Sequence, residues 1–240
     1  MCIRTDRTHM MDDLATAFKD IRNWVFDLDD TLYPPSEEVY SQMAKRICAF
    51  VMRALNVDEK TASVIQKDYY RKYGATVCGL MLEHNIPPDE FTDYVHRLDL
   101  SSIMENPRLR DCLNALNGQK FVFTNGAHSH AERVLERLGL CECFSGIFSI
   151  SEAGYIPKPA ERTYLKMLNT FKIAPAESAM FDDSPVNILA AKKVGMKTVW
   201  ISSNVANNPY CSVDDKNFCD FETPDLVEFL TELTGKEKNR

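Results

Sequence analysis

A short apolar run that ends in carboxylates is the feature that most constrains the fold of this chain. Trp24, Val25 and Phe26 favour β-structure and show no polar alternation, and Asp27 and Asp29 follow at once. Such a run predicts a strand buried on both faces, as in a parallel sheet covered by helices. In open α/β sheets, ligands bind outside the carboxyl ends of the strands, so we expect these two carboxylates to face a site.

Strand and helix patterns alternate through the second half of the chain. The expected strands are 120–124, 146–150, 179–181 and 197–201, and the expected helices are 107–116, 128–138, 160–171 and 185–194. This alternation predicts an α/β fold with a doubly wound parallel sheet. We also expect an amphipathic helix at 9–21, an irregular segment at 203–223 and a final helix opened by Pro224.

A block with only helical patterns lies between the first expected strand and the second. Its expected helices are 37–55, 58–73, 75–84 and 87–97. The segment Tyr33-Pro34-Pro35 cannot continue a helix or a central strand, so it marks a boundary before the block. Asn106 followed by Pro107 opens a new helix after the block. We therefore predict a core made of residues 1–35 and 105–240, with an all-helical cap of residues 36–104 inserted after the first strand.

Composition narrows the class of protein. An apolar content of 45% in 240 residues is enough for a sizeable interior. A net charge of −7 argues against a general nucleic-acid binder and against binding to an anionic membrane. The eight cysteines show no zinc spacing and no apolar run approaches the ~20 residues that span a membrane, so we expect free thiols in a cytoplasmic protein. None of these features predicts an oligomeric state.

Polar residues also follow the later strands. Thr124 ends one strand just before a helix, and the N-terminus of a helix attracts phosphate. Lys158 stands between two prolines, which hold its backbone extended. Asp182 and Asp183 repeat the opening pattern of an apolar strand that ends in carboxylates. Because clustered carboxylates repel each other unless a cation lies between them, we predict a Mg2+ site at this edge of the sheet.

At these residues the sequence resembles the haloacid dehalogenase (HAD) superfamily of phosphohydrolases. Its four motifs are matched in order by Asp27-Leu-Asp-Asp-Thr31, Thr124-Asn125, Lys158 and Asp182-Asp183. The resemblance implies a Rossmann-like core, and the helical insertion is similar in position to the first cap type of the superfamily. The segments 27–34 and 70–74 resemble the pyrimidine 5′-nucleotidase branch.

The resemblance implies a Mg2+-dependent phosphomonoesterase in which Asp27 attacks phosphorus and Asp29 acts as the acid and base. Thr124, Asn125 and Lys158 would hold the phosphate. Asp27, the backbone carbonyl of Asp29 and Asp183 would bind the metal. Asp182 would be either a further ligand or a partner of the ligands, and Asn187 a partner. Asp30 is expected to fix the turn.

Four residues are candidates for contact with the base or sugar of a nucleoside monophosphate: Tyr33, Tyr73, Thr76 and His128. Packing explains each aromatic residue of the cap as well, and we expect His128 and His130 at the surface. The alternatives left open are another hydrolase of small phosphate esters, a phosphosugar mutase, a dehalogenase and a receiver-type module that is phosphorylated without turnover.

Overall fold

Six parallel strands form one sheet in the computed structural model, which describes residues 14–204 and 217–235. The strands are β1 (Asn23–Phe26), β2 (Gln119–Phe123), β3 (Gly146–Phe148), β4 (Ser178–Asp182), β5 (Lys197–Ile201) and β6 (Phe221–Thr223). Their order is β3-β2-β1-β4-β5-β6, and each neighbouring pair runs parallel. The predicted doubly wound α/β sheet is confirmed.

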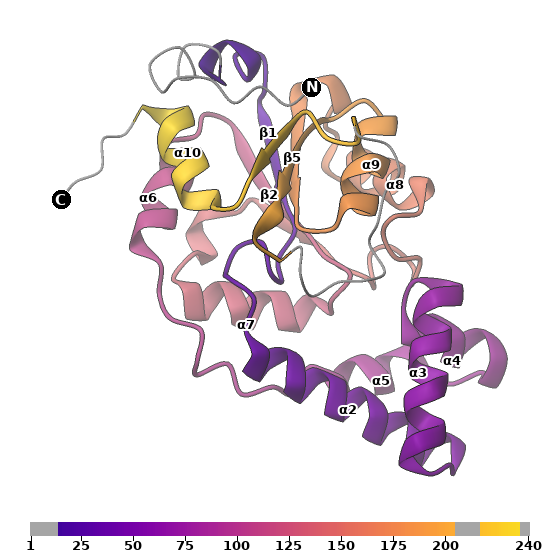
Figure 1. The fold of residues 1–240 in the computed structure, drawn as a ribbon. Coiled ribbons are helices and arrows are strands. Elements are labelled where there is room, and N and C mark those ends of the chain that lie inside the picture. The colour runs from indigo at the N-terminus through magenta and orange to yellow at the C-terminus, as the bar shows by residue number, and fades with distance from the viewer. Residues whose placement is uncertain (1–13, 205–216, 236–240) are drawn as a thin grey trace.

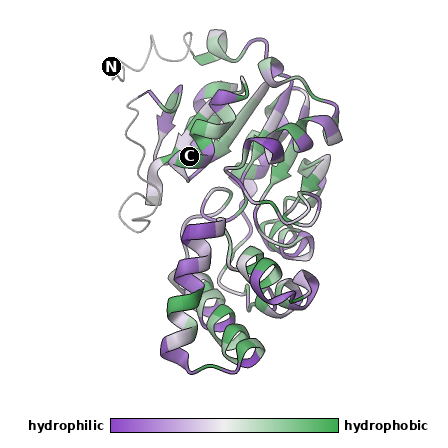
Figure 2. Ribbon diagram, turned by 90° about the vertical axis from the view of Figure 1, so that its right-hand side faces the viewer, coloured by the Kyte–Doolittle hydropathy of each residue, from purple (hydrophilic) through white to green (hydrophobic). Residues whose placement is uncertain are grey.

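Helices cover both faces of the sheet, as the uninterrupted apolar strands predict (Figure 1). One face carries α6 (Pro107–Ala115), α7 (His128–Leu138) and α10 (Leu226–Thr234), and the other carries α8 (Glu161–Phe171) and α9 (Pro185–Lys193). Successive residues of β1 serve the two faces, because Trp24 and Phe26 pack in one apolar cluster and Val25 packs in the other. Apolar residues accordingly dominate the strands in Figure 2.

The order of the strands fixes the position of the site. From β1 in the middle of the sheet, the chain builds β2 and β3 on one side and β4 to β6 on the other. The two directions diverge at β1, and a ligand crevice forms where strand order reverses in this way. Asp27 follows β1, Thr124 follows β2 and Asp183 follows β4, so three adjacent strands end at one place.

The inserted helices form a separate layer, drawn in purple tones at the lower right of Figure 1. They are α2 (Glu37–Leu55), α3 (Glu59–Tyr73), α4 (Thr76–His84) and α5 (Pro88–Val95). These helices share an apolar cluster of their own, which includes Phe50, Leu80 and Val95. Leu98, Leu100 and Ile103 pack instead with the sheet. We therefore propose that the cap ends near residue 97, and not at 104 as the sequence suggested.

Three of the differences between the predicted and the observed elements concern the ends of the chain. The first helix covers Leu14 to Ala17 and then turns, and 9–13 lie outside the described residues. The segment 203–223 contains β6, a three-residue edge strand without an apolar run. The last helix begins at Leu226, because the carboxylate of Asp225 accepts the backbone N–H of Glu228 and caps it.

Two expectations from composition can be examined directly. None of the described helices is both long and apolar enough to cross a membrane. The cysteines in the described part of the chain, which are Cys48, Cys78, Cys112, Cys141, Cys143 and Cys219, all carry free thiols.

Candidate active site

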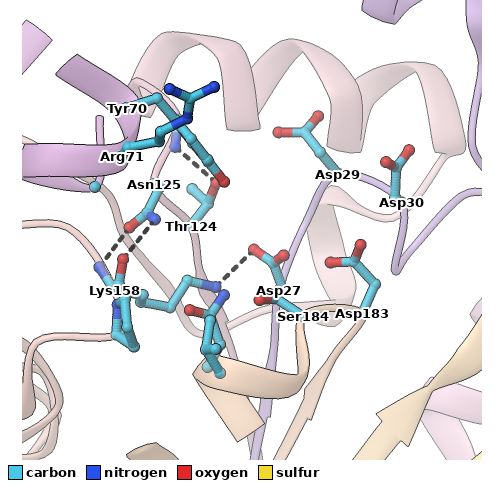
Figure 3. Close-up of a pocket in the computed structure, with 15 residues that line it drawn as sticks. Asp27, Asp29, Asp30, Tyr70, Arg71, Thr124, Asn125, Lys158, Asp183 and Ser184 are labelled. Carbon is cyan, nitrogen blue, oxygen red and sulfur yellow. Dashed lines mark hydrogen bonds and ion pairs between the residues drawn. The ribbon is translucent and has the colours of Figure 1, made fainter. Parts of the chain in front are cut away.

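A cavity of about 420 Å³ lies between the carboxyl ends of the strands and the cap (Figure 3). This volume is in the range of small-molecule sites, roughly 300–1,000 Å³. The core contributes most of the polar lining, which includes Asp27, Asp29, Asp30, Thr124, Asn125, Lys158, Asp183, Ser184 and Asn187. Helix α3 and the turn after it contribute Tyr70, Arg71 and Gly74.

Lys158 lies at the floor of this cavity and is 2% exposed. Its Nζ is 2.9 Å from Oδ1 of Asp27 and 2.7 Å from Oδ2 of Asp182, and it also donates to the carbonyl of Phe123 at 2.8 Å. Burial by itself would lower the pKa of this lysine, but the two carboxylates outweigh burial and raise the pKa above its ordinary value. A fixed ammonium charge is thus held against one oxygen of Asp27.

Asp182 holds Lys158 in place. Its side chain is fully buried and does not line the cavity. While Oδ2 accepts from Lys158, Oδ1 accepts from the backbone N–H of Ser184 at 2.8 Å and from Nδ2 of Asn187 at 3.0 Å. Of the two roles that the sequence left open for Asp182, the geometry favours a partner of the site residues over a metal ligand.

The acidic residues fit a divalent cation. Asp27, Asp182 and Asp183 each offer a carboxylate oxygen, and these oxygens lie within 4.8 Å of one another. Burial, together with Asp182 and other nearby carboxylates, raises the pKa of Asp183 to about 9 and that of Asp27 to about 7, although Lys158 opposes the rise. A bound cation removes such repulsion, and Mg2+ prefers carboxylate oxygen. The donor set therefore fits Mg2+, with Asp27 and Asp183 facing the cavity.

Asp29 is held by two donors that come from different parts of the chain. The hydroxyl of Tyr33 donates to Oδ1 of Asp29 at 2.6 Å, and Nε2 of His130 lies 2.9 Å from the same oxygen. Burial would raise the pKa of Asp29, but the charge of His130 and the hydrogen bonds from His130 and Tyr33 lower it to about 2. Asp30, whose φ is 60°, makes the turn beside it in the left-handed region that Asp tolerates.

The prediction that His130 lies at the surface is wrong, because its side chain is fully buried. The sequence did carry a signal: His130 lies in the first turn of the helix that follows Thr124, and that helix begins at the same end of the sheet as Asp29. Sequence distance hid the contact, since 101 positions separate the two residues.

Thr124 and Asn125 play different parts. Oγ1 of Thr124 accepts the backbone N–H of Gly126 at 2.9 Å, and Thr124 lines the cavity. Asn125 is committed to the neighbouring loop, because its Oδ1 accepts the N–H of Lys158 at 2.8 Å and its Nδ2 donates to the carbonyl of Lys158 at 3.2 Å. The side chain of Asn125 therefore holds the Lys158 loop in place, which differs from the phosphate contact expected of it.

The four predicted substrate contacts do not line the cavity. Tyr33 binds Asp29, and the hydroxyl of Tyr73 donates to Glu83 within the cap. Thr76 is buried and donates to the carbonyl of Gln66. Nδ1 of His128 lies 3.2 Å from Oε1 of Glu152.

Tyr70 and Arg71 line the cavity from the cap instead. Helical periodicity explains why these two residues, and not Tyr73, line the cavity. Tyr69 and Tyr73 are four residues apart on one face of α3, and their ring centroids lie 5.8 Å apart. Tyr70 and Arg71 lie on the next face around that helix, which is the one turned to the core.

Comparison with known proteins agrees with this geometry. Residues 21–195 match the family model described as haloacid dehalogenase-like hydrolase, which is more than half of the chain. The chain belongs to this family. The hydrolase is 28% identical over 232 residues to a glyceraldehyde 3-phosphate phosphatase of Pyrococcus furiosus, a match that covers 89% of this chain and 94% of the relative.

Two further relatives of this HAD-like hydrolase are more distant or only partly covered. It is 28% identical over 193 residues to phosphate metabolism protein 8 of Saccharomyces cerevisiae, covering 71% of this chain and 58% of that protein. Among solved structures, a HAD phosphatase from Thermococcus onnurineus aligns with a TM-score of 0.60 at 19% identity, covering 90% of this chain and 99% of the other. That likeness concerns the fold alone.

Proposed function

We propose that this HAD-like hydrolase is a Mg2+-dependent phosphomonoesterase that works through an aspartyl-phosphate on Asp27. The observation that carries the proposal is the bridge made by Lys158, which holds Oδ1 of Asp27 at 2.9 Å on the floor of a cavity that Asp183 and Thr124 also line. A carboxylate fixed in this way is a positioned nucleophile. The ammonium group of Lys158 reduces the repulsion between this carboxylate and an anionic phosphate.

Each residue then has a task in two chemical steps. An oxygen of Asp27 bonds to phosphorus while the ester P–O bond breaks, and Asp29 gives a proton to the leaving oxygen. Water next bonds to phosphorus, Asp29 takes a proton from it, and the bond between phosphorus and Asp27 breaks. Lys158 and the hydroxyl of Thr124 stabilise the charge on the phosphoryl oxygens throughout. Bound Mg2+, held by Asp27, Asp183 and the carbonyl of Asp29, would supply further neutralisation of that charge.

The low pKa of Asp29 suits this cycle. A pKa of about 2 means that the carboxylate is ionised before substrate binds. An arriving phosphate dianion brings negative charge near this carboxylate and so raises its affinity for a proton. Asp29 therefore takes up a proton from solvent when the ester binds, gives it to the leaving oxygen as the acid, and is then ionised again to act as the base toward water.

The substrates proposed first are nucleoside 5′-monophosphates, with pyrimidine bases preferred. The resemblance of segments 27–34 and 70–74 to the pyrimidine 5′-nucleotidase branch supports this choice. Tyr70 and Arg71 on the cap side of the cavity supply an aromatic ring and hydrogen-bond donors for a base or sugar.

A small sugar phosphate is the second candidate. It is supported by the printed name of the Pyrococcus furiosus relative, with which the chain aligns over nearly its full length. Such a substrate would fill less of the cavity than a nucleotide and would leave the cap side to water.

Phosphate release from a panel of esters tests the proposal. The panel holds uridine, cytidine, adenosine and guanosine 5′-monophosphates, glyceraldehyde 3-phosphate and glucose 1-phosphate, each with Mg2+ and with EDTA, and Asp27→Asn is the blank. We expect Mg2+-dependent turnover that Asp27→Asn lacks, with the pyrimidine nucleotides fastest. Equal rates on purine and pyrimidine nucleotides would remove the base preference. No turnover on any ester, with one phosphoryl group taken up from acetyl phosphate, would favour a signalling module.

A further inference from the structure

We propose that His130 is a positioning residue that orients the Asp29 carboxylate for proton transfer, acting on one oxygen so that the other faces the reacting atoms. This inference rests on the proposed phosphatase function. It assigns a role to a helix residue outside the four sequence motifs.

Both donors to Asp29 meet at the same atom. Nε2 of His130 and the hydroxyl of Tyr33 lie 2.9 and 2.6 Å from Oδ1, and among the described residues no hydrogen bond to Oδ2 is found. The Asp29 side chain keeps 32% exposure and lines the cavity. Two donors on one oxygen fix the plane of the carboxylate and reserve Oδ2 for the leaving oxygen and the incoming water.

The ring of His130 is itself held firmly. It is fully buried, and the ring of His96 packs against it at a centroid distance of 4.9 Å. A Cβ added to Gly126 would lie 3.3 Å from Cδ2 of His130, 3.2 Å from Oγ1 of Thr124 and 3.7 Å from Oδ2 of Asp29. The glycine therefore allows these three groups to approach one another closely.

The hydrogen-bond inventory of the ring indicates that Nε2 carries a proton. An ionised carboxylate only accepts hydrogen bonds, so Nε2 of His130 must donate to Asp29. Nδ1 is buried and has no hydrogen-bond partner in the described part of the chain. The hydrogen bond to Asp29 is therefore the one that the ring makes in the described part of the chain.

In the proposed cycle, His130 keeps its proton. Oδ2 of Asp29 gives its proton to the leaving oxygen as the P–O ester bond breaks, and it later takes a proton from water as the bond between phosphorus and Asp27 breaks. Removing His130 lets the carboxylate rotate and so weakens both transfers. The loss must be greatest for a leaving group that depends on receiving a proton.

The test compares two esters, an alkyl phosphate with a basic leaving oxygen and p-nitrophenyl phosphate, whose leaving group departs without a proton. For His130→Phe, which keeps a ring but has no donor, we expect the single-turnover rate constant of phosphoenzyme formation to fall ~10- to 100-fold with the alkyl ester. With p-nitrophenyl phosphate we expect the same rate constant to change less than about threefold. His130→Gln, which retains an N–H donor, should recover part of the loss. Glu132→Ala, an exposed change on the same helix, is the matched control.

Each outcome bears on the inference. If the two esters lose rate equally in His130→Phe, the residue is structural and the inference fails. If His130→Phe matches the wild-type rate on the alkyl ester, the inference fails while the phosphatase function stands. If the wild-type protein hydrolyses neither ester with Mg2+, the proposed function fails and the inference falls with it.

Discussion

The two acidic residues at the end of β4 lie next to each other in the chain but have different surroundings. Asp182 is fully buried with both oxygens hydrogen-bonded, whereas Asp183 lines the cavity. Burial and the neighbouring carboxylates raise the pKa of Asp183 to about 9. We propose that the pair divides its work, with Asp182 fixing Lys158 and Asp183 available to a bound cation.

Asparagine substitutions separate these two roles. Asp183→Asn should raise the Mg2+ concentration needed for half-maximal activity by ~10- to 100-fold, because a ligand charge is lost. Asp182→Asn should leave that concentration within about threefold but lower the free energy of unfolding by about 3 kcal/mol, since it removes a partner of the buried Lys158. Mg2+ titrations of activity and urea unfolding measure the two effects. A Mg2+ requirement that rises equally in both variants would contradict the division.

At this scale the sequence identifies residue types better than contacts. Asp27, Thr124 and Asp183 stand at strand ends, and a parallel sheet places strand ends together, so their convergence on one cavity could be predicted. The partners of Asp29 could not, because strand patterns say nothing about which helix side chain reaches a carboxylate.

At the scale of elements, α3 and α4 of the cap pack closely against each other at Gly79 of α4. A Cβ added to Gly79 would overlap the Cβ and Cγ atoms of Tyr69, which lie close to the backbone of α3 and cannot swing away. Alanine favours a helix over glycine by ~1 kcal/mol, but this overlap costs about 1–3 kcal/mol. The overlap therefore decides the sign of the change in stability that Gly79→Ala causes.

Gly79→Ala should destabilise the cap despite the better helix propensity of alanine. We expect the melting temperature to fall by several degrees, since ~1 kcal/mol corresponds to a shift of about 2–4 °C in a chain of this size. The control is Leu82→Ala on the same helix, where the side chain is 69% exposed and the expected effect is near zero. A melting temperature that rises in Gly79→Ala would show that α3 and α4 pack less closely than described.

Helix α7 also clamps the segment that returns from the cap to the core. Arg133 donates to the carbonyls of His96 and Leu98, and Arg137 donates to those of Leu100, Ser101 and Ile103. Since His130 lies on the same helix, one element contacts both the Asp29 carboxylate and the segment that returns from the cap.

Loss of one arginine should loosen this segment without unfolding the protein. In Arg137→Ala we expect amide hydrogen exchange in residues 98–104 to accelerate roughly tenfold, because hydrogen bonds from a charged donor are worth about 1.5–3 kcal/mol. Exchange in β1 and β4 should not change. Glu136→Ala on the same helix is the control, and unchanged exchange at 98–104 in Arg137→Ala would mean that the clamp carries no stability.

An N-capping residue made some element boundaries predictable. Asn106 caps α6 through the N–H of Leu109, as its position before Pro107 predicted. Strand β6 has only three residues and pairs on one side with β5, so no apolar run announces it. We propose an earlier exit from the cap than the sequence suggested, because Leu98, Leu100 and Ile103 pack on the sheet without forming a regular element.

At the scale of the whole molecule, the site makes stability depend on pH. The pKa of Asp183 is raised from 3.8 to about 9 and that of Asp27 from 3.8 to about 7, because burial and like charges disfavour their ionised forms. At pH values between the ordinary pKa of 3.8 and the raised pKa values of these two residues, the folded protein without metal binds more protons than the unfolded chain. Its stability must therefore fall as pH rises through this window.

Mg2+ should reverse this trend, because it binds the ionised carboxylates. We expect the rise in melting temperature on adding Mg2+ to grow between about pH 5 and about pH 9, and we expect the protein in EDTA to melt progressively lower over the same range. Thermal melts in both conditions measure it, with Asp183→Asn giving a flatter profile. A stabilisation by Mg2+ that does not change with pH would contradict the raised pKa values.

The central claim is that Asp27 carries the phosphoryl group during turnover, and trapping that group tests it most directly. Asp29→Asn lacks the base that completes hydrolysis, so mixing it with Mg2+ and p-nitrophenyl phosphate and quenching in acid should preserve the intermediate. We expect one phosphoryl group per chain, located by mass spectrometry on the peptide that contains Asp27. This group should be absent from the double variant that also carries Asp27→Asn. Steady phosphate release by the wild-type protein with a phosphoryl group on another residue, or on none, would contradict it.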